Sequence, residues 1–157
     1  MAVRPIPEGY HTLTAYLAVD DAGEAIQFYK RAFGAKESVR MDAPGGKVGH
    51  AELQIGDSRV MLSDPMPQSV VRPPKELGGR TASIFMYSED VDAAVKQAVE
   101  AGATVEMEPE NMFWGDRFGS VLDPYGHLWS IATHVEDLSP EEIAERGKEA
   151  MAAMSSS

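Results

Sequence analysis

Residues 12–34, TLTAYLAVDDAGEAIQFYKRAFG, predict a strand followed by a helix, and this pair decides the fold. Apolar and polar side chains alternate over 12–19, which is the period of a β-strand with two unlike faces. A helix over about 21–33 should follow, because Asp21 is a good N-cap and Gly34 suits a left-handed stop. This stretch is therefore a β-α unit.

Three further strands are expected after this helix, separated by Gly-Gly and Gly-Asp turn signals. They lie at about 36–43, 48–55 and 59–63. The first half of the chain is thus predicted to be a βαβββ unit.

The same order of elements repeats in the second half of the chain. Asp90 and Gly102 stand where Asp21 and Gly34 stand in the first unit, at the two ends of an amphipathic stretch. The predicted elements are a strand at 81–87, a helix at 90–101 and strands at 104–110, 117–123 and 127–134. The second half is therefore a second βαβββ unit.

We expect these units to form one domain over residues 1–157. Its parts are a first module at about 10–64, a proline- and glycine-rich linker at about 65–80, a second module at about 81–135 and a C-terminal helical extension at about 136–154. Ser139 and Glu142 form a capping box that should begin the extension.

Composition excludes several kinds of site. The chain has 157 residues, no cysteine and a formal net charge of −11. Without cysteine there is no disulfide framework, zinc ribbon, iron–sulfur cluster or thiolate nucleophile. The basic residues are scattered singly, which argues against a nucleic-acid partner. No apolar stretch is long enough for a membrane span and no signal peptide is evident, so we expect a cytoplasmic protein.

The two βαβββ units resemble a known superfamily in three stretches of sequence. These are AIQFYKRAFG at 25–34, GHAELQIGD at 49–57 and FWGDRFGSVLDPYGHLWSIATH at 113–134. Together they resemble the vicinal oxygen chelate superfamily, which includes glyoxalase I, extradiol dioxygenases, fosfomycin-resistance enzymes and bleomycin-binding proteins. The resemblance is greatest to its PhnB-like, or 3-demethylubiquinone-methyltransferase-like, branch, and it covers about residues 10–135.

The resemblance implies an α+β fold in which two βαβββ modules form a curved mixed sheet with a concave cup. The cup is the expected ligand site. An open curved sheet also exposes strand edges and a concave apolar surface that a second copy can cover, so we expect a homodimer.

The resemblance also implies where a metal would be bound. In metal-dependent members of the superfamily, the ligands come from equivalent strands of the two modules, and these places fall on Thr14, Met61, Ser83 and Ser130. Hydroxyl groups and a thioether cannot hold a hard divalent ion tightly. We therefore expect no cofactor and no divalent metal at these positions, which disfavours a metal-dependent glyoxalase, dioxygenase or fosfomycin transferase.

His50 and Glu52 are the candidate catalytic residues. If Ala51 and Leu53 face the helix, strand alternation places His50 and Glu52 on the opposite, concave face, roughly 6.5–7 Å apart along the strand. They are an acid–base pair, displaced metal ligands that need a third residue, or ordinary residues of a rim or subunit interface. The sequence leaves these three interpretations open.

The remaining candidates give the cup a mixed aromatic and hydroxyl lining. Such a lining suits a planar or amphipathic organic molecule. Core packing of each aromatic side chain, and a local turn pair between Asp116 and Arg117, are the alternatives. The full set of candidate ligand-binding residues is Thr14, Tyr16, His50, Glu52, Met61, Ser83, Phe85, Trp114, Asp116, Arg117 and Ser130.

Three functions remain open from the sequence. The first is a small-molecule binding protein that lacks the superfamily's usual metal. The second is an enzyme of the lyase or dioxygenase type that uses His50 and Glu52 as displaced metal ligands or as an acid–base pair. The third is a protein of the same branch that acts beside other enzymes of a metabolic pathway and has no simple activity class.

Overall fold

The computed structural model describes residues 2–156, and its helices and strands follow the predicted order. The first module contains β1 (Ala15–Ala18), α1 (Ala22–Phe33), β2 (Lys36–Ala43), β3 (Lys47–Ile55) and β4 (Ser58–Ser63). Its strands form one sheet in the order β1-β4-β3-β2, in which β1 is parallel to β4 and the other pairs are antiparallel.

The second module repeats this arrangement. It contains β5 (Ile84–Tyr87), α3 (Val91–Ala101), β6 (Thr104–Asn111), β7 (Asp116–Leu122) and β8 (Leu128–His134). Its sheet has the order β5-β8-β7-β6, again with one parallel pair, β5 with β8. The predicted α+β fold of two βαβββ modules is confirmed, and each module forms a four-stranded mixed sheet of its own.

The first strand of each module is shorter than predicted. β1 begins at Ala15, where it pairs with Val60, and β5 begins at Ile84, where it pairs with Trp129. β4 and β8 already begin at Ser58 and Leu128, before these partner residues, but the chain that precedes β1 and β5 does not pair with them. The predicted starts at residues 12 and 81 were therefore wrong, because alternation of side chains does not supply a pairing partner.

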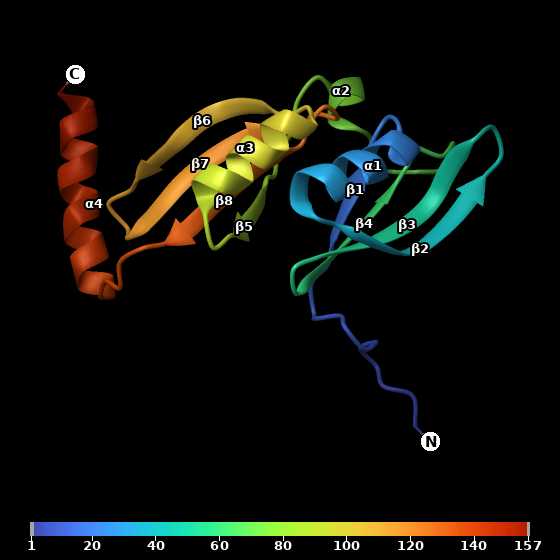
Figure 1. Ribbon diagram of the computed structural model, residues 1–157, viewed down its shortest axis with the longest axis horizontal. Helices are drawn as coiled ribbons and strands as arrows, with labels where there is room; N and C mark the ends of the chain where they lie inside the picture. The colour runs from blue at the N-terminus through green and yellow to red at the C-terminus, as the bar shows by residue number, and fades with distance from the viewer. Residues whose placement is uncertain (1, 157) are drawn as a thin grey trace.

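Two elements lie outside the modules. The linker contains a four-residue helix, α2 (Pro74–Leu77), which the proline and glycine content of this segment did not predict. After the second module, α4 (Pro140–Ser155) begins with the predicted capping box of Ser139 and Glu142. None of the residues of α4 is buried, and this helix stands at the end of the molecule opposite the first module (Figure 1).

The two modules pack against each other through α1, α3 and the start of β8. The rings of Tyr29 and Phe33 lie 5.4 and 4.5 Å from the Trp129 ring, measured between centroids. Helices α1 and α3 lie on the viewer's side of the two sheets in Figure 1. The opposite face of each sheet is called the open face below. Among the described residues, no helix is long and apolar enough to cross a membrane.

Candidate functional site

The open face of the first module holds a chain of hydrogen bonds between strands. Tyr16, Met61 and Glu52 pair across β1, β4 and β3, so their side chains stand in one row. The Tyr16 hydroxyl lies 3.0 Å from His50 Nδ1, and His50 Nε2 lies 3.1 Å from Glu52 Oε1. Both ring nitrogens of His50 therefore have a partner, and His50 and Glu52 do share one face.

A fourth residue, Tyr10, belongs to this chain of hydrogen bonds and was missed by the sequence analysis. Its hydroxyl donates to Glu52, and the Arg59 guanidinium stands over its ring, 5.1 Å from the centroid. Tyr10 lies in an irregular segment 42 residues before Glu52, so no strand or helix period links the two positions. The segment that precedes β1 thus reaches the open face of the first module.

These contacts stabilise the charged form of Glu52. The hydrogen bond from Tyr10, and then that from His50, lower the pKa of the Glu52 carboxyl below its ordinary value. A carboxylate with a lowered pKa is a weaker proton acceptor. The arrangement therefore favours polar binding over general-base catalysis at Glu52.

The open face of the second module is organised by the buried carboxylate of Asp116. Its exposed fraction is 3%, and Oδ2 accepts hydrogen bonds from Trp114 Nε1 at 3.0 Å and from the Tyr87 hydroxyl at 3.1 Å. His134 Nδ1 lies 2.8 Å from Oδ1, and His134 Nε2 lies 2.8 Å from Asp137 Oδ1. One carboxylate thus fixes the orientation of three rings.

Four aromatic side chains form a cluster beside this carboxylate through contacts between their rings, and we call them the aromatic face: Phe85, Tyr87, Trp114 and Phe118. The Phe85 ring lies 5.3 Å from that of Tyr87 and 5.8 Å from that of Phe118, and the Trp114 ring lies 5.8 Å from that of Phe118. Phe85 is 49% exposed and Tyr87 63% exposed. Large aromatic surfaces that remain exposed together commonly mark a binding site.

Arg117 does not join the aromatic face. Its guanidinium donates to the Asp92 carboxylate of α3 at 2.6 and 2.9 Å, on the helix-covered side of the sheet. Adjacent residues of a strand point to opposite faces, so Asp116 and Arg117 cannot both line the same site. The structure thus separates these two predicted site residues.

The four places implied for metal ligands are divided between the two modules. Thr14 and Met61 are half-buried in the first, whereas in the second Ser83 is exposed and Ser130 is buried beside Phe85 in the sheet. Nowhere in residues 2–156 do three or more histidine, cysteine, aspartate or glutamate side chains form a group that could hold a metal ion. The residues at these four places do not fit a divalent ion, because they offer neither imidazole nor carboxylate.

The pKa of His134 should lie above the ordinary histidine value. The hydrogen bonds to Asp116 and then to Asp137 raise its pKa above 6.5, because both partners favour the imidazolium. The stabilisation that it contributes is therefore complete below the ordinary pKa and is lost as the pH rises through the raised value. NMR titration of the ring protons should show this shift, and Asp137→Asn should reduce it. An ordinary His134 pKa in the wild type would contradict the observed geometry.

Comparison with known proteins identifies relatives of the whole two-module region. The family model described as "Glyoxalase/Bleomycin resistance protein/Dioxygenase superfamily" matches residues 10–131. The uncharacterized protein Rv0887c of Mycobacterium tuberculosis is 44% identical over 134 residues, which cover 83% of this chain and 79% of that protein. The Arabidopsis thaliana protein At5g48480 is 32% identical over 118 residues, or 70% of each chain.

Solved structures show the same fold. TioX from Micromonospora sp. ML1 has a TM-score of 0.64 and 29% sequence identity, covering 80% of this chain and 99% of its own. A Bacillus cereus PhnB protein, described as a putative 3-demethylubiquinone-9 3-methyltransferase, has a TM-score of 0.60 and 18% identity, covering 78% of this chain and 99% of its own. At that identity, the second likeness concerns the fold alone.

Proposed function

The chain belongs to the Glyoxalase/Bleomycin resistance protein/Dioxygenase superfamily, and from this premise we propose that it binds a small aromatic or amphipathic organic molecule without the superfamily's usual metal. The observation that carries the proposal is the aromatic face. Phe85 and Tyr87 expose large ring surfaces beside Trp114, and the Asp116 carboxylate fixes the indole of Trp114 and the phenol of Tyr87.

The energetics favour apolar contact as the main source of affinity. Covering apolar surface contributes about 25 cal/mol per Å², and a well-placed pair of aromatic rings adds roughly 0.5–1.5 kcal/mol. Rings that are already held by hydrogen bonds lose little conformational freedom when a ligand stacks on them. The aromatic face is therefore a preorganised platform for a planar ligand.

The absence of metal ligands at the implied positions supports the same proposal. Thr14, Met61, Ser83 and Ser130 supply two aliphatic hydroxyls from serine, one from threonine and a thioether. The side chains at these four positions cannot bind the divalent ion on which the metal-dependent reactions of the superfamily rely. Binding to the aromatic face needs no such ion.

Trp114→Ala should weaken ligand binding more than Glu52→Gln does. We suggest N-phenyl-1-naphthylamine as the probe, because it is aromatic and uncharged. Its fluorescence titration should give a dissociation constant about tenfold higher in Trp114→Ala, which corresponds to about 1.4 kcal/mol. Glu52→Gln should change it by less than about threefold, since this residue lies on the other module.

Lys148→Gln, on the exposed surface of α4, is a suitable control for the effect of any surface substitution. Equal probe affinity in the wild type and Trp114→Ala would refute binding at the aromatic face. Mass spectrometry of the purified protein should in addition look for a copurified organic molecule, which would name the natural ligand class.

A second candidate function is supported by the hydrogen bonds of His50. Because both of its ring nitrogens have partners, this imidazole is held in place between Tyr16 and Glu52, as an acid–base residue would be. If a reaction is found for this chain, its loss in Glu52→Gln with ligand binding intact would identify Glu52 as a catalytic base. A bound metal that is lost in both His50→Ala and Glu52→Ala would instead support displaced ligands.

A further inference from the structure

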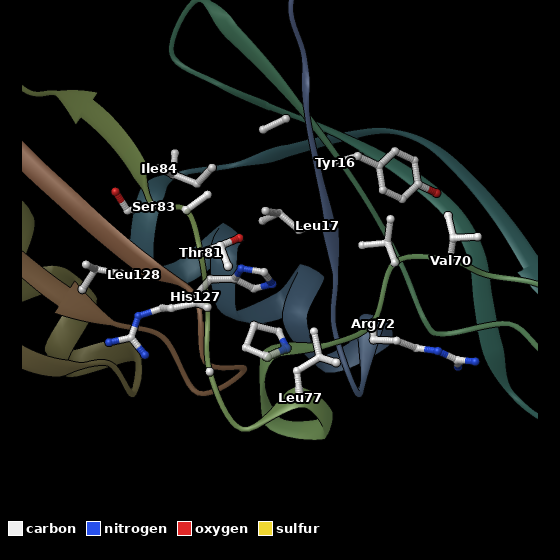
Figure 2. Close-up of a pocket in the computed structure, with 16 residues that line it drawn as sticks. Tyr16, Leu17, Val70, Arg72, Leu77, Thr81, Ser83, Ile84, His127 and Leu128 are labelled. Carbon is white, nitrogen blue, oxygen red and sulfur yellow. The ribbon is translucent and has the colours of Figure 1, made fainter.

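A groove of about 790 Å³ lies between the two modules, and none of the four residues of the aromatic face lines it. Its walls come from the edge strands β1 and β5, from the linker and from the start of β8, as Figure 2 shows. The large apolar side chains that line it are Leu17, Val70, Val71, Leu77, Ile84 and Leu128. Its volume is within the usual range of small-molecule sites, roughly 300–1,000 Å³.

The charge of this groove is opposite to that of the protein. Aspartate and glutamate make up 25 of the 157 residues, yet none of the 16 lining residues is acidic. Two lining residues, Arg72 and Arg80, are cationic. The net charge of −11 repels anions at long range, so an anion bound here depends on these local cations.

The two arginines differ in what they already bind. Arg72 Nε lies 3.7 Å from the Glu76 carboxylate, and its side chain extends away from the middle of the groove (Figure 2). Arg80 forms no hydrogen bond or ion pair with any residue in the described part of the chain. The free guanidinium of Arg80 is therefore the group in the groove that is ready to bind an anion.

We propose that this groove binds an organic carboxylate with an apolar body, such as a medium-chain fatty acid anion. The planar guanidinium of Arg80 matches the two oxygens of a carboxylate. Thr81 directly follows Arg80 and Ser83 lies three residues on, both are exposed and line the groove, and their hydroxyls can donate further hydrogen bonds to the same head group. The apolar body then lies against Leu17, Ile84 and Leu128.

His127 contributes a fixed wall to the groove. Its Nε2 donates to the carbonyl oxygen of Ala18 at 2.8 Å, which ties the second module to the end of β1 beside the groove. The groove is thus built on a contact between the modules and not on the linker alone. This ligand site is separate from the aromatic face, and each proposal can fail without the other.

The probes for the test are decanoate and decyltrimethylammonium, which share an apolar tail and have opposite charges. Isothermal titration calorimetry at low ionic strength should show tighter binding of decanoate to the wild type. Arg80→Gln should weaken decanoate binding at least about fivefold, and Arg80→Glu should reverse the preference in favour of decyltrimethylammonium. Both changes are at an exposed residue, and thermal melting should confirm that the variants remain folded.

Lys148→Gln removes one positive charge from α4, which does not line the groove, and is the matched control. Equal effects of Arg80→Gln and Lys148→Gln on decanoate would overturn the proposal, as would equal wild-type affinity for the two probes. Amide NMR shifts should locate decanoate at Ile84 and Leu128. Shifts at Phe118 and Trp114 instead would place it on the aromatic face and would also overturn this assignment.

Discussion

Asp123→Ala should lower the free energy of unfolding by about 3–5 kcal/mol, because it removes a buried carboxylate that four donors share. Asp123 is 3% exposed. Its Oδ2 accepts from the Tyr29 hydroxyl at 2.6 Å and from Trp129 Nε1 at 2.9 Å. Its Oδ1 accepts from the backbone N–H groups of Tyr125 and His127, each at 2.9 Å. The alanine variant leaves all four donors without this acceptor.

Urea denaturation followed by circular dichroism measures this loss. The matched control is Asp57→Ala in the turn between β3 and β4, an exposed aspartate whose carboxylate accepts a hydrogen bond from Ser58. It should change stability by less than about 0.5 kcal/mol. Tyr29→Phe should lower the free energy of unfolding by about 1–2 kcal/mol, which lies between the other two variants. It removes one hydrogen bond, and Trp129 keeps its acceptor. A loss below 1 kcal/mol in Asp123→Ala would contradict its role in joining the modules.

Gly115→Ala should lower the free energy of unfolding by about 2–5 kcal/mol and disturb the aromatic face. Gly115 has a φ of +98°, and an added Cβ would lie 2.4 Å from the carbonyl oxygen of Glu136. The Gly115 carbonyl oxygen also accepts from the N–H groups of Val135 and Glu136, both at 3.0 Å. The backbone therefore cannot relax without breaking these bonds and moving the adjacent Trp114.

The matched control for Gly115→Ala is Gly45→Ala. Gly45 has a similar φ of +81°, but an added Cβ would meet no atom within 4 Å. Gly45→Ala should therefore lower the free energy of unfolding only through backbone strain, by about 1–2 kcal/mol. The measurements are urea denaturation and the emission spectrum of Trp114 in a Trp129→Phe background. Equal stability losses at the two positions would show that the contact with Glu136 does not constrain the chain.

Local signals were sufficient to predict most of the fold. Asp21 and Asp90 were expected to cap the two helices, and their carboxylates do accept from the N–H groups of Glu24 and Ala93. Those signals act over three residues, so the sequence reveals them directly. The length of β1 depends instead on how far its backbone runs alongside β4, and that is a property of the assembled sheet.

The candidate site was only partly predictable for the same reason. Strand alternation was enough to bring His50 and Glu52 to one face, since the period holds along a single strand. Because Asp116 and Arg117 are adjacent in one strand, the same period allows only one of them to line the site. The sequence does not show which of the two faces the site. Tyr10 was beyond any such rule, because it meets Glu52 from outside the regular elements.

The shared carboxylate of Asp123 bears on the order in which the protein folds. Within the second module, Trp129 and two nearby backbone N–H groups can bind it as soon as the turn before β8 forms. Tyr29 lies 94 residues away, and closing a loop of that length costs about 4 kcal/mol of chain entropy. We therefore expect the hydrogen bond from Tyr29 to form late, when two largely assembled modules dock, and the transition state for docking to contain Asp123 already bound by its own module.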